Sequence, residues 1–394
     1  MSLIPRNKGE RIKVAIVVPK YGLLGGGERF ASIITGILAK NESMQFHVFA
    51  NRWVSNSSRI QFHKVPTIPF PRFLRPLSFS FFAQHMIDQG KFDIVHSHDR
   101  MFRADVFSVH CVPHGGWVRN IRGKRQSLFD RSLAGIERSM MRANAESWFL
   151  PVSSLAMDAF IKKYTTLPGK WDVFHPGVDV SQFSSPSRDS CRREIRQRYG
   201  ISESAFLILF VGMNFEVKGL HTIIEALAKA RTVRPDADLK LLVVGRGNLQ
   251  KYNALARSLG TCDAVVFAGP QNEGIEHYYR AADVFMMLSV FDTFGMVVLE
   301  AMAAGLPVII SSTVGAKDLI DDGVNGFVIP EQSDSDSAAE RIVRLLDGNT
   351  REEMGAASMR IAFGNDWSRL ASRMEMVYQE VLDRKLPASA QKGR

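Results

Sequence analysis

Residues 283–311 read DVFMMLSVFDTFGMVVLEAMAAGLPVIIS, and this pattern predicts a strand, a helix and a second strand. The apolar run 283–289 has the length and composition of a buried strand, and PVIIS (307–311) has the same character. Between them, Gly295 precedes a helical run that reaches Ala304. Two strands joined by a helix form the repeating unit of a parallel sheet.

The same alternation of strand-like and helical runs continues on both sides of this stretch. A turn at Pro176-Gly177 divides it, so we predict two α/β domains with doubly wound sheets, residues 1–176 and 177–365. Residues 366–394 form a last helix and a tail. The expected strands are 14–19, 45–50, 92–98, 105–110, 147–154, 205–212, 239–245, 264–269, 283–289, 307–311 and 326–330.

Length and charge agree with two domains. A chain of 394 residues exceeds one ordinary core, and its net charge of +10 is concentrated in residues 1–175, which hold 25 Lys and Arg against 12 Asp and Glu. This excess favours an anionic partner. No apolar run approaches the roughly 18 residues of a membrane span, the N-terminus resembles no secretion signal, and three dispersed cysteines give no disulfide framework. We expect a cytoplasmic protein.

The residues with the most chemical information follow the strand ending near Ser289. Ligands of open α/β sheets bind beyond the carboxyl ends of the strands. Gly295 allows close approach, and the helix start behind it suits a phosphate. Asp292 before the helix and Glu300 within it are placed to reach sugar hydroxyl groups on either side. This arrangement predicts a nucleotide-sugar site, whereas the alternative is a glutamate that pairs inside a buried crossover helix.

Other strand ends add glycines and cations. Gly212 ends a strand, and Lys218 precedes the next helix, where its ammonium can neutralise a diphosphate. Arg246 lies in the turn VVGRGN (243–248), which contacts the nucleotide or is a plain tight turn. In the first half, GLLGGGERF (22–30) opens a helix and matches the dinucleotide fingerprint poorly, so we interpret it as an anion-facing loop.

These stretches together resemble a known family. SVFDTFGMVVLEAMAAGLPVI resembles the donor-site signature of retaining glycosyltransferase family four, also called group 1, and VGMNFEVKG, GGGERF and HPGVD resemble its other motifs in the family's order. Within the family, the chain resembles the glucosyltransferases of lipopolysaccharide core assembly. The resemblance implies a GT-B fold, in which two Rossmann-like domains face each other across a cleft and the C-terminal helix crosses back to the first domain. The first domain would then bind the acceptor and the second the nucleotide-sugar.

The resemblance also assigns roles to residues. Glu300 matches the glutamate that holds the nucleotide ribose, Lys218 the lysine on the diphosphate, and His110 a histidine near the reacting sugar. Asp292 replaces the family's first glutamate with a side chain one methylene shorter. Met213 replaces an arginine, so Arg246 is expected to assist Lys218. The other expected binding residues are Gly26, Gly27, Gly212, Thr293, Phe294, Gly295, Met296 and Val297.

We expect neither a metal nor another cofactor. The pattern H-x-H-D at 96–99 suggests a metal pair, but strand alternation places His96 and His98 on one face and Asp99 on the other. The resemblance implies instead that the acceptor hydroxyl attacks from the front face while the leaving phosphate takes its proton.

Two basic segments indicate the acceptor. Residues 119–142 combine seven basic side chains with apolar residues at helical spacing, and residues 69–82 mix aromatics with arginines. Such segments lie on an anionic membrane, or else the apolar residues pack on the sheet and the arginines are solvated. No nucleic-acid recognition module is visible.

The sequence thus predicts a retaining transferase of a hexose, glucose in particular, from a UDP-linked donor to a hydroxyl of a lipopolysaccharide core or other membrane-associated glycan. We expect it to be peripheral on the inner face of the cytoplasmic membrane. The alternatives are a transferase with a soluble acceptor, a sugar-nucleotide epimerase of the same shape, and an NAD-binding or non-enzymatic binding protein.

Overall fold

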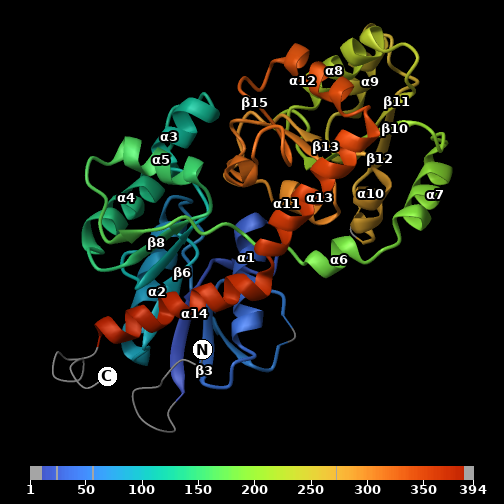
Figure 1. The fold of residues 1–394 in the computed structure, drawn as a ribbon. Coiled ribbons are helices and arrows are strands. Elements are labelled where there is room, and N and C mark those ends of the chain that lie inside the picture. The colour runs from blue at the N-terminus through green and yellow to red at the C-terminus, as the bar shows by residue number, and fades with distance from the viewer. Residues whose placement is uncertain (1–10, 24, 56, 272, 386–394) are drawn as a thin grey trace. The chain divides into compact units, whose positions relative to one another are not determined.

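The structure, a computed structural model, describes residues 11–23, 25–55, 57–271 and 273–385. The chain divides into two compact units, residues 1–176 together with 367–394, and residues 177–366 (Figure 1). We call them the N-terminal unit and the C-terminal unit. Most of the N-terminal stretch that we compared with a secretion signal, and the tail after Lys385, lie outside the described residues.

The N-terminal unit contains a seven-stranded parallel sheet of order β5-β3-β1-β6-β7-β8-β9. Central strands such as β1 are buried on both faces, which explains why they are continuous apolar runs in the sequence. The strands are β1 Ile12–Val17, β3 Met44–Ala50, β5 Ile60–Lys64, β6 Ile94–Ser97, β7 Val106–Val109, β8 Trp148–Pro151 and β9 Lys170–Trp171. A separate parallel pair joins β2 (Lys20–Tyr21) and β4 (Arg52–Trp53).

Helices flank this sheet. They are α1 Gly26–Leu38, α2 Leu74–Gly90, α3 His114–Gly116, α4 Leu128–Ala143, α5 Ser154–Lys163 and α14 Trp367–Arg384, with a π-helical turn at Trp117–Ile121. The helix α4 begins with a capping box in which Ser127 and Asp130 bond reciprocally. The last helix, α14, returns to this unit, where it packs beside α1 and β6 (Figure 1). Its contacts include a hydrogen bond of 2.9 Å from Arg373 to the Val173 carbonyl.

The C-terminal unit contains a six-stranded parallel sheet of order β12-β11-β10-β13-β14-β15. All six predicted strands are present. They are β10 Phe206–Met213, β11 Leu239–Arg246, β12 Val265–Gly269, β13 Val284–Met287, β14 Val308–Ser311 and β15 Gly326–Ile329. The helices are α6 Val180–Ser184, α7 Arg188–Tyr199, α8 Leu220–Val233, α9 Leu249–Ser258, α10 Ile275–Ala281, α11 Met296–Ala303, α12 Ser335–Arg344 and α13 Gly348–Gly364, with a 3-10 helix at Gly315–Leu319.

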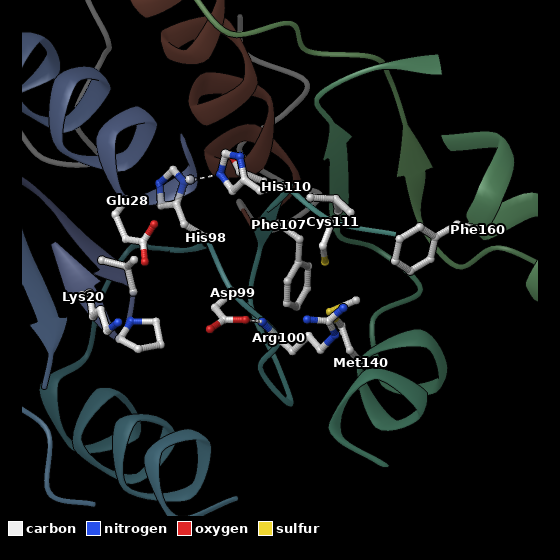
Figure 2. A pocket seen from close by; sticks show the side chains of 15 residues that line it. Lys20, Glu28, His98, Asp99, Arg100, Phe107, His110, Cys111, Met140 and Phe160 are labelled. Atoms are coloured by element: carbon white, nitrogen blue, oxygen red, sulfur yellow. Dashed lines mark hydrogen bonds between the residues drawn. The ribbon is translucent and has the colours of Figure 1, made fainter. Parts of the chain in front are cut away.

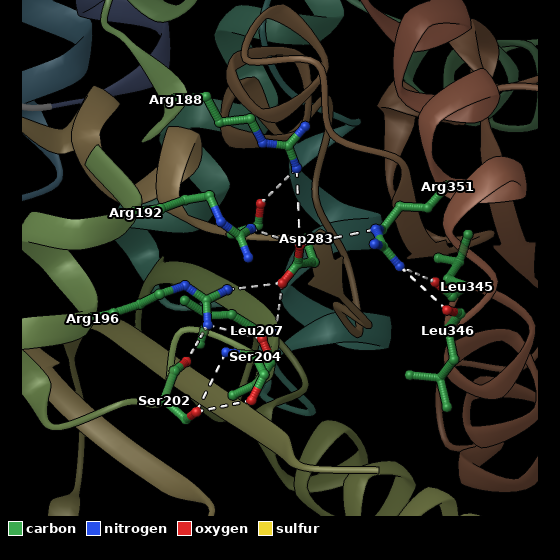
Figure 3. Close-up of polar contacts among 12 residues, drawn as sticks. Arg188, Arg192, Arg196, Ser202, Ser204, Leu207, Asp283, Leu345, Leu346 and Arg351 are labelled. Atoms are coloured by element: carbon green, nitrogen blue, oxygen red, sulfur yellow. Dashed lines mark hydrogen bonds and ion pairs between the residues drawn. The ribbon is translucent and has the colours of Figure 1, made fainter. Parts of the chain in front are cut away.

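A buried carboxylate connects the helix α7 to the amino end of this second sheet. Asp283, just before β13, is 3% exposed and accepts hydrogen bonds from Arg192 at 2.8 Å and from Arg196 at 3.0 Å (Figure 3). It also accepts from the Leu207 backbone N–H at 2.9 Å. Arg196 is fully buried and donates to two carbonyl groups in the turn before β10. One carboxylate therefore fixes α7 against β10 and β13.

The topology determines where ligands can bind. In the C-terminal unit, β11 and β13 lie on opposite sides of β10, so the loops after β10 and β13 diverge at a switch point of the sheet. In the N-terminal unit, β3 and β6 flank β1 in the same way. The candidate residues lie at the carboxyl ends of β7, β10, β11 and β13, in the loops that follow them, or at the start of the helices α1 and α11. None of the described helices is long and apolar enough to cross a membrane.

Candidate active site

Two glycines shape the switch point of the C-terminal unit. Gly219 begins α8 at φ 76° and Gly295 begins α11 at φ 86°. A Cβ at Gly219 would lie 1.8 Å from the Leu288 carbonyl oxygen, which no side chain could relieve. The two loops are joined by hydrogen bonds of 2.8 Å from the Val290 N–H and the Ser289 hydroxyl to the Val217 carbonyl. The start of each helix is therefore held at one edge of the sheet.

Lys218 and Asp292 meet at this edge. The Lys218 ammonium forms an ion pair with the Asp292 carboxylate, and both side chains are about one-fifth exposed, at 21% and 18%. The other carboxylate oxygen of Asp292 accepts from the Phe294 N–H at 3.2 Å, which closes the turn before α11. Thr293, Met296 and Val297 are partly exposed around this turn, whereas Phe294 is buried.

A second cation lies on the neighbouring strand. Met213 at the end of β10 and Arg246 at the end of β11 are partners in the sheet register, and both are exposed. Gly212 packs closely under Lys218, because a Cβ there would approach the lysine Cγ to 3.1 Å. Arg246 therefore lies beside the position where the family pattern has an arginine, on the same edge as Lys218.

Glu300 occupies a more enclosed position within α11. Its side chain is 6% exposed, and the Tyr279 hydroxyl donates to its Oε2 at 3.0 Å. Tyr279 comes from α10 and is itself fully buried. The sequence analysis missed Tyr279, since the run HYYR gives no sign of which tyrosine faces α11. The hydrogen bond orients the carboxylate, which is a prerequisite for recognising a hydroxyl group.

In the N-terminal unit, the glycine-rich turn lies against a histidine. Gly26 and Gly27 are the first residues of α1, and a Cβ at Gly27 would lie 3.2 Å from the His110 ring. His110 follows β7, and its ring contacts Phe30 edge-on with 4.9 Å between centroids. The turn therefore brings backbone, instead of a side chain, up to the His110 imidazole.

Two further histidines extend from His110 into the unit. His98 Nδ1 lies 3.3 Å from His110 Nε2, and the rings of His98 and His96 are 4.2 Å apart, so the predicted shared face is confirmed. His96 bonds Tyr378 of α14 at 2.8 Å and Ser108 at 2.9 Å. Burial lowers the pKa of His110 to about 4 and that of His96 to about 3, so both are neutral at pH 7.

The hydrogen-bond pattern assigns the tautomer of His110. His98 Nε2 is buried without a hydrogen-bond partner among the described residues. A buried N–H without an acceptor costs more than a bare ring nitrogen, so His98 carries its proton on Nδ1 and donates it to His110 Nε2. His110 then carries its own proton on Nδ1, and this N–H is the donor that it can offer to a ligand.

A cavity of about 360 Å³ opens beside His110 (Figure 2). Its polar lining comes from β2, α1 and β7 and from the residues that follow β6 and β7, and its walls include Phe107 and Phe160. The charged and polar side chains that line it are Lys20, Glu28, His98, Asp99, Arg100, Ser108 and His110. Arg100 is held by a bond of 2.9 Å to Glu137, which is buried. Among the described residues, no three His, Cys, Asp or Glu side chains are grouped to hold a metal ion.

Comparisons with known proteins agree with this architecture. Residues 24–182 match the family described as Glycosyltransferase Family 4, and residues 191–360 match Glycosyl transferases group 1. A D-inositol 3-phosphate glycosyltransferase of Kribbella flavida is 31% identical over 325 residues, which cover 75% of this chain and 73% of that protein. The chain belongs to the group 1, or family 4, glycosyltransferases, and it is an enzyme of this class.

Solved structures show the same fold. WaaG, a glycosyltransferase involved in lipopolysaccharide biosynthesis, superposes with a TM-score of 0.75 at 25% identity, over 93% of this chain and 99% of that one. Anabaena Alr3699/HepE, solved in complex with UDP-glucose, superposes with a TM-score of 0.71 at 18% identity, over 94% and 100%. The two parallel sheets are thus the Rossmann-like units of a GT-B fold, and the predicted fold class is confirmed.

Proposed function

We propose that the protein is a retaining hexosyltransferase that moves glucose from UDP-glucose to a hydroxyl group of a membrane-associated glycan such as a lipopolysaccharide core. The observation that carries this proposal is the Lys218–Asp292 ion pair beside the glycine-started helix α11. An ammonium, a carboxylate and free helical N–H groups at one edge suit a diphosphate joined to a sugar. The similarity to WaaG and to HepE with bound UDP-glucose supports the choice of donor and acceptor.

On the donor side, the diphosphate would take the place of Asp292 as the partner of Lys218. Lys218, Arg246 and the backbone of residues 293–297 would then stabilise the charge that develops on the leaving group. Asp292, released from the lysine, would accept hydrogen bonds from hydroxyls of the hexose. Glu300, oriented by Tyr279, would hold the ribose hydroxyls. Gly212 would leave room for the lysine stem under the diphosphate.

In the reaction, the bond between the sugar C1 and the diphosphate oxygen breaks, and a bond from C1 to the acceptor oxygen forms on the same face. The acceptor proton passes to the departing phosphate oxygen, and the products are UDP and the glycoside. No metal ion or other cofactor is invoked. The N-terminal unit would bind the acceptor around Gly26, Gly27 and His110, with the His110 Nδ1–H as a hydrogen-bond donor.

The membrane-facing part of the proposal rests on exposed side chains around the helices α2 and α4 of the N-terminal unit, which pack side by side. Phe70, which lies before α2, is 84% exposed, and Leu128, the first residue of α4, is 61% exposed. Exposed arginines and a lysine lie between them in sequence at 119–125. Exposed apolar side chains next to cations suit the inner face of an anionic membrane.

Nucleotide-sugar binding tests the proposal directly. Wild type and Glu300→Gln are titrated with UDP-, ADP- and GDP-linked hexoses, and slow hydrolysis of each donor is followed. We expect UDP-glucose to bind and to be hydrolysed by wild type, and Glu300→Gln to bind it much more weakly. If no nucleotide-sugar binds, the donor assignment is wrong. Flotation with anionic vesicles separates a membrane acceptor from a soluble one, since only the former requires the protein to float.

A further inference from the structure

A second cavity, of about 410 Å³, adjoins the His110 cavity in the N-terminal unit. The two share the lining residues Pro19, Lys20, Asp99 and Arg100. Besides Arg100, four cationic side chains line this second cavity, Lys20, Arg52, Arg72 and Arg75, and we call it the arginine pocket. Both cavities open within one compact unit, so their adjacency is a property of that unit.

The four cations of the arginine pocket lack a carboxylate partner among the described residues. Other arginines, such as Arg103 and Arg192, form ion pairs with aspartates. Asp99 is the only carboxylate in the lining, whereas Arg100 already pairs with Glu137. The pocket therefore has a large excess of positive charge next to the acceptor side of the proposed active site.

The folded state holds these four cations in electrostatically unfavourable positions. Lys20 and Arg52 are direct partners in the two-stranded β2–β4 ladder, which places two like charges on adjacent strands. Arg72 and Arg75 flank the start of α2, whose first turn contains no acidic residue. Cations are unfavourable at a helix N-terminus because of the helix dipole. Cations that repel one another and have no carboxylate partner are typical of a site that binds an anionic ligand.

The other side chains that line the arginine pocket indicate what kind of anion it can bind. Phe79, Phe129, Leu133 and Ile136 form an apolar side, and the Arg72 guanidinium lies 5.8 Å from the centre of the Phe129 ring, which restrains it. Asn51 and Thr67 add hydrogen-bonding groups, themselves 3.3 Å apart. A pocket of this volume, lined by both apolar and cationic side chains, accommodates a sugar ring that carries a phosphate.

We propose that the arginine pocket binds a phosphate group carried by the acceptor, one sugar position away from the hydroxyl that is glycosylated beside His110. This inference rests on the proposed function. It specifies that the acceptor is a phosphorylated glycan and that its phosphate, held by Arg72 and Arg75 with Lys20 and Arg52, selects it over neutral glycans.

The test uses the full chain and simple probes. Binding of glucose 6-phosphate, inorganic phosphate and glucose is measured by ligand-observed NMR at constant ionic strength, with wild type and the double variant R72Q/R75Q. The charge-matched control is K162Q/K163Q, which removes two exposed lysines at the end of α5. A third variant, Lys218→Gln, alters the donor loop, and UDP is titrated into every sample.

We expect glucose 6-phosphate to bind wild type, the control and Lys218→Gln alike, and to bind R72Q/R75Q at least about tenfold more weakly. Glucose should show no such difference. Equal binding to R72Q/R75Q and the control overturns the proposal, as does loss of binding in Lys218→Gln, which would place the phosphate in the donor loop. Inorganic phosphate that binds as tightly as glucose 6-phosphate overturns the assignment to a sugar.

The same samples separate this proposal from the function on which it rests. UDP should bind R72Q/R75Q as it binds wild type and should bind Lys218→Gln weakly. If UDP and nucleotide-sugars bind none of the proteins, the donor assignment fails, while the phosphate result still decides whether the arginine pocket takes an anion.

Discussion

Lys218 and Asp292, 74 residues apart in the chain, form an ion pair between the loops that follow β10 and β13. These strands are neighbours, and the pair lies at the point where the order of the sheet reverses. Ion pairs of this partial exposure contribute little stability, because solvent screens them. Its importance lies in its position: the ion pair holds both side chains beside the start of α11, where we propose that the sugar diphosphate binds.

The ion pair predicts that substitutions of Asp292 and Lys218 affect the affinity for UDP differently. Asp292→Asn removes the competitor for Lys218, so UDP should bind at least as tightly as to wild type, while hydrolysis of UDP-glucose falls by about a hundredfold. Lys218→Gln should weaken both. Calorimetry with UDP and a hydrolysis assay with UDP-glucose check this.

A suitable control for the ion-pair variants is Lys229→Gln, which breaks an exposed ion pair to Asp336 in the same unit. It should leave both measurements unchanged. If Asp292→Asn weakens UDP and UDP-glucose equally, Asp292 does not contact the sugar and serves only to hold the lysine.

The Tyr279–Glu300 hydrogen bond predicts a selective loss of ribose recognition. Wild type should prefer UDP to its 2′,3′-dideoxy analogue, because a carboxylate that binds hydroxyls gains nothing from an analogue that lacks them. Glu300→Gln should abolish this preference, and Tyr279→Phe should reduce it about threefold to tenfold, since the carboxylate loses its orientation but keeps its charge.

The neighbouring tyrosine provides the control for Tyr279. Tyr278 bonds Tyr199 at 2.9 Å and does not bond Glu300. Tyr278→Phe should keep the full preference for UDP. A Tyr279→Phe protein that binds both nucleotides less tightly by the same factor would show a structural role for the tyrosine, with no part in ribose recognition.

The two parallel sheets and their loops could be predicted because strands buried on both faces leave apolar runs that sequence periodicity detects. The short strands could not: β9 has two residues, and β5 has the burial pattern of an edge strand with polar side chains. The helix α2 was missed as well, since Pro76 and three phenylalanines obscure its amphipathic period.

Residues that act through partners far apart in the chain were beyond sequence reasoning. Lys218 and Asp292 were each recognised, but their pairing depends on strand order, which sequence does not contain. Tyr378 reaches His96 only because α14 packs on the N-terminal unit. Arg72 and Arg75 were assigned to a membrane surface from their aromatic neighbours, whereas the fold also makes them line a cavity.

The buried Asp283 predicts a large loss of stability in the C-terminal unit. Asp283→Asn would leave Arg196, which is fully buried, without a charged partner, and breaking such a pair costs about 3–5 kcal/mol of unfolding free energy. Urea denaturation followed by circular dichroism checks this. Asp236→Asn, which disrupts an exposed ion pair with Arg234, should leave the unfolding free energy nearly unchanged, because solvent screens that pair. Similar losses for both variants would contradict the buried-pair account.

The buried histidines His96 and His110 predict how the stability of the N-terminal unit depends on pH. An unperturbed histidine of the unfolded chain binds its proton near pH 6.5, whereas His110 and His96 of the folded protein do so only near pH 4 and pH 3. Between pH 6.5 and 4 the unfolded state binds more protons, so stability is full above pH 6.5 and falls as the pH decreases. Each histidine contributes up to about 1.4 kcal/mol per pH unit.

Unfolding of wild type and His110→Gln at several pH values measures this contribution. The variant removes one of the titrating groups, so its unfolding free energy should fall less steeply between pH 6.5 and 5, whatever its stability at pH 8. NMR supplies the second readout: the ring-proton shifts of His110 should stay constant from pH 8 to pH 5. A His110 shift that titrates near pH 6.5 would mean that the imidazole is solvated and charged during acidification, and then it could not serve as a neutral Nδ1–H donor held by His98.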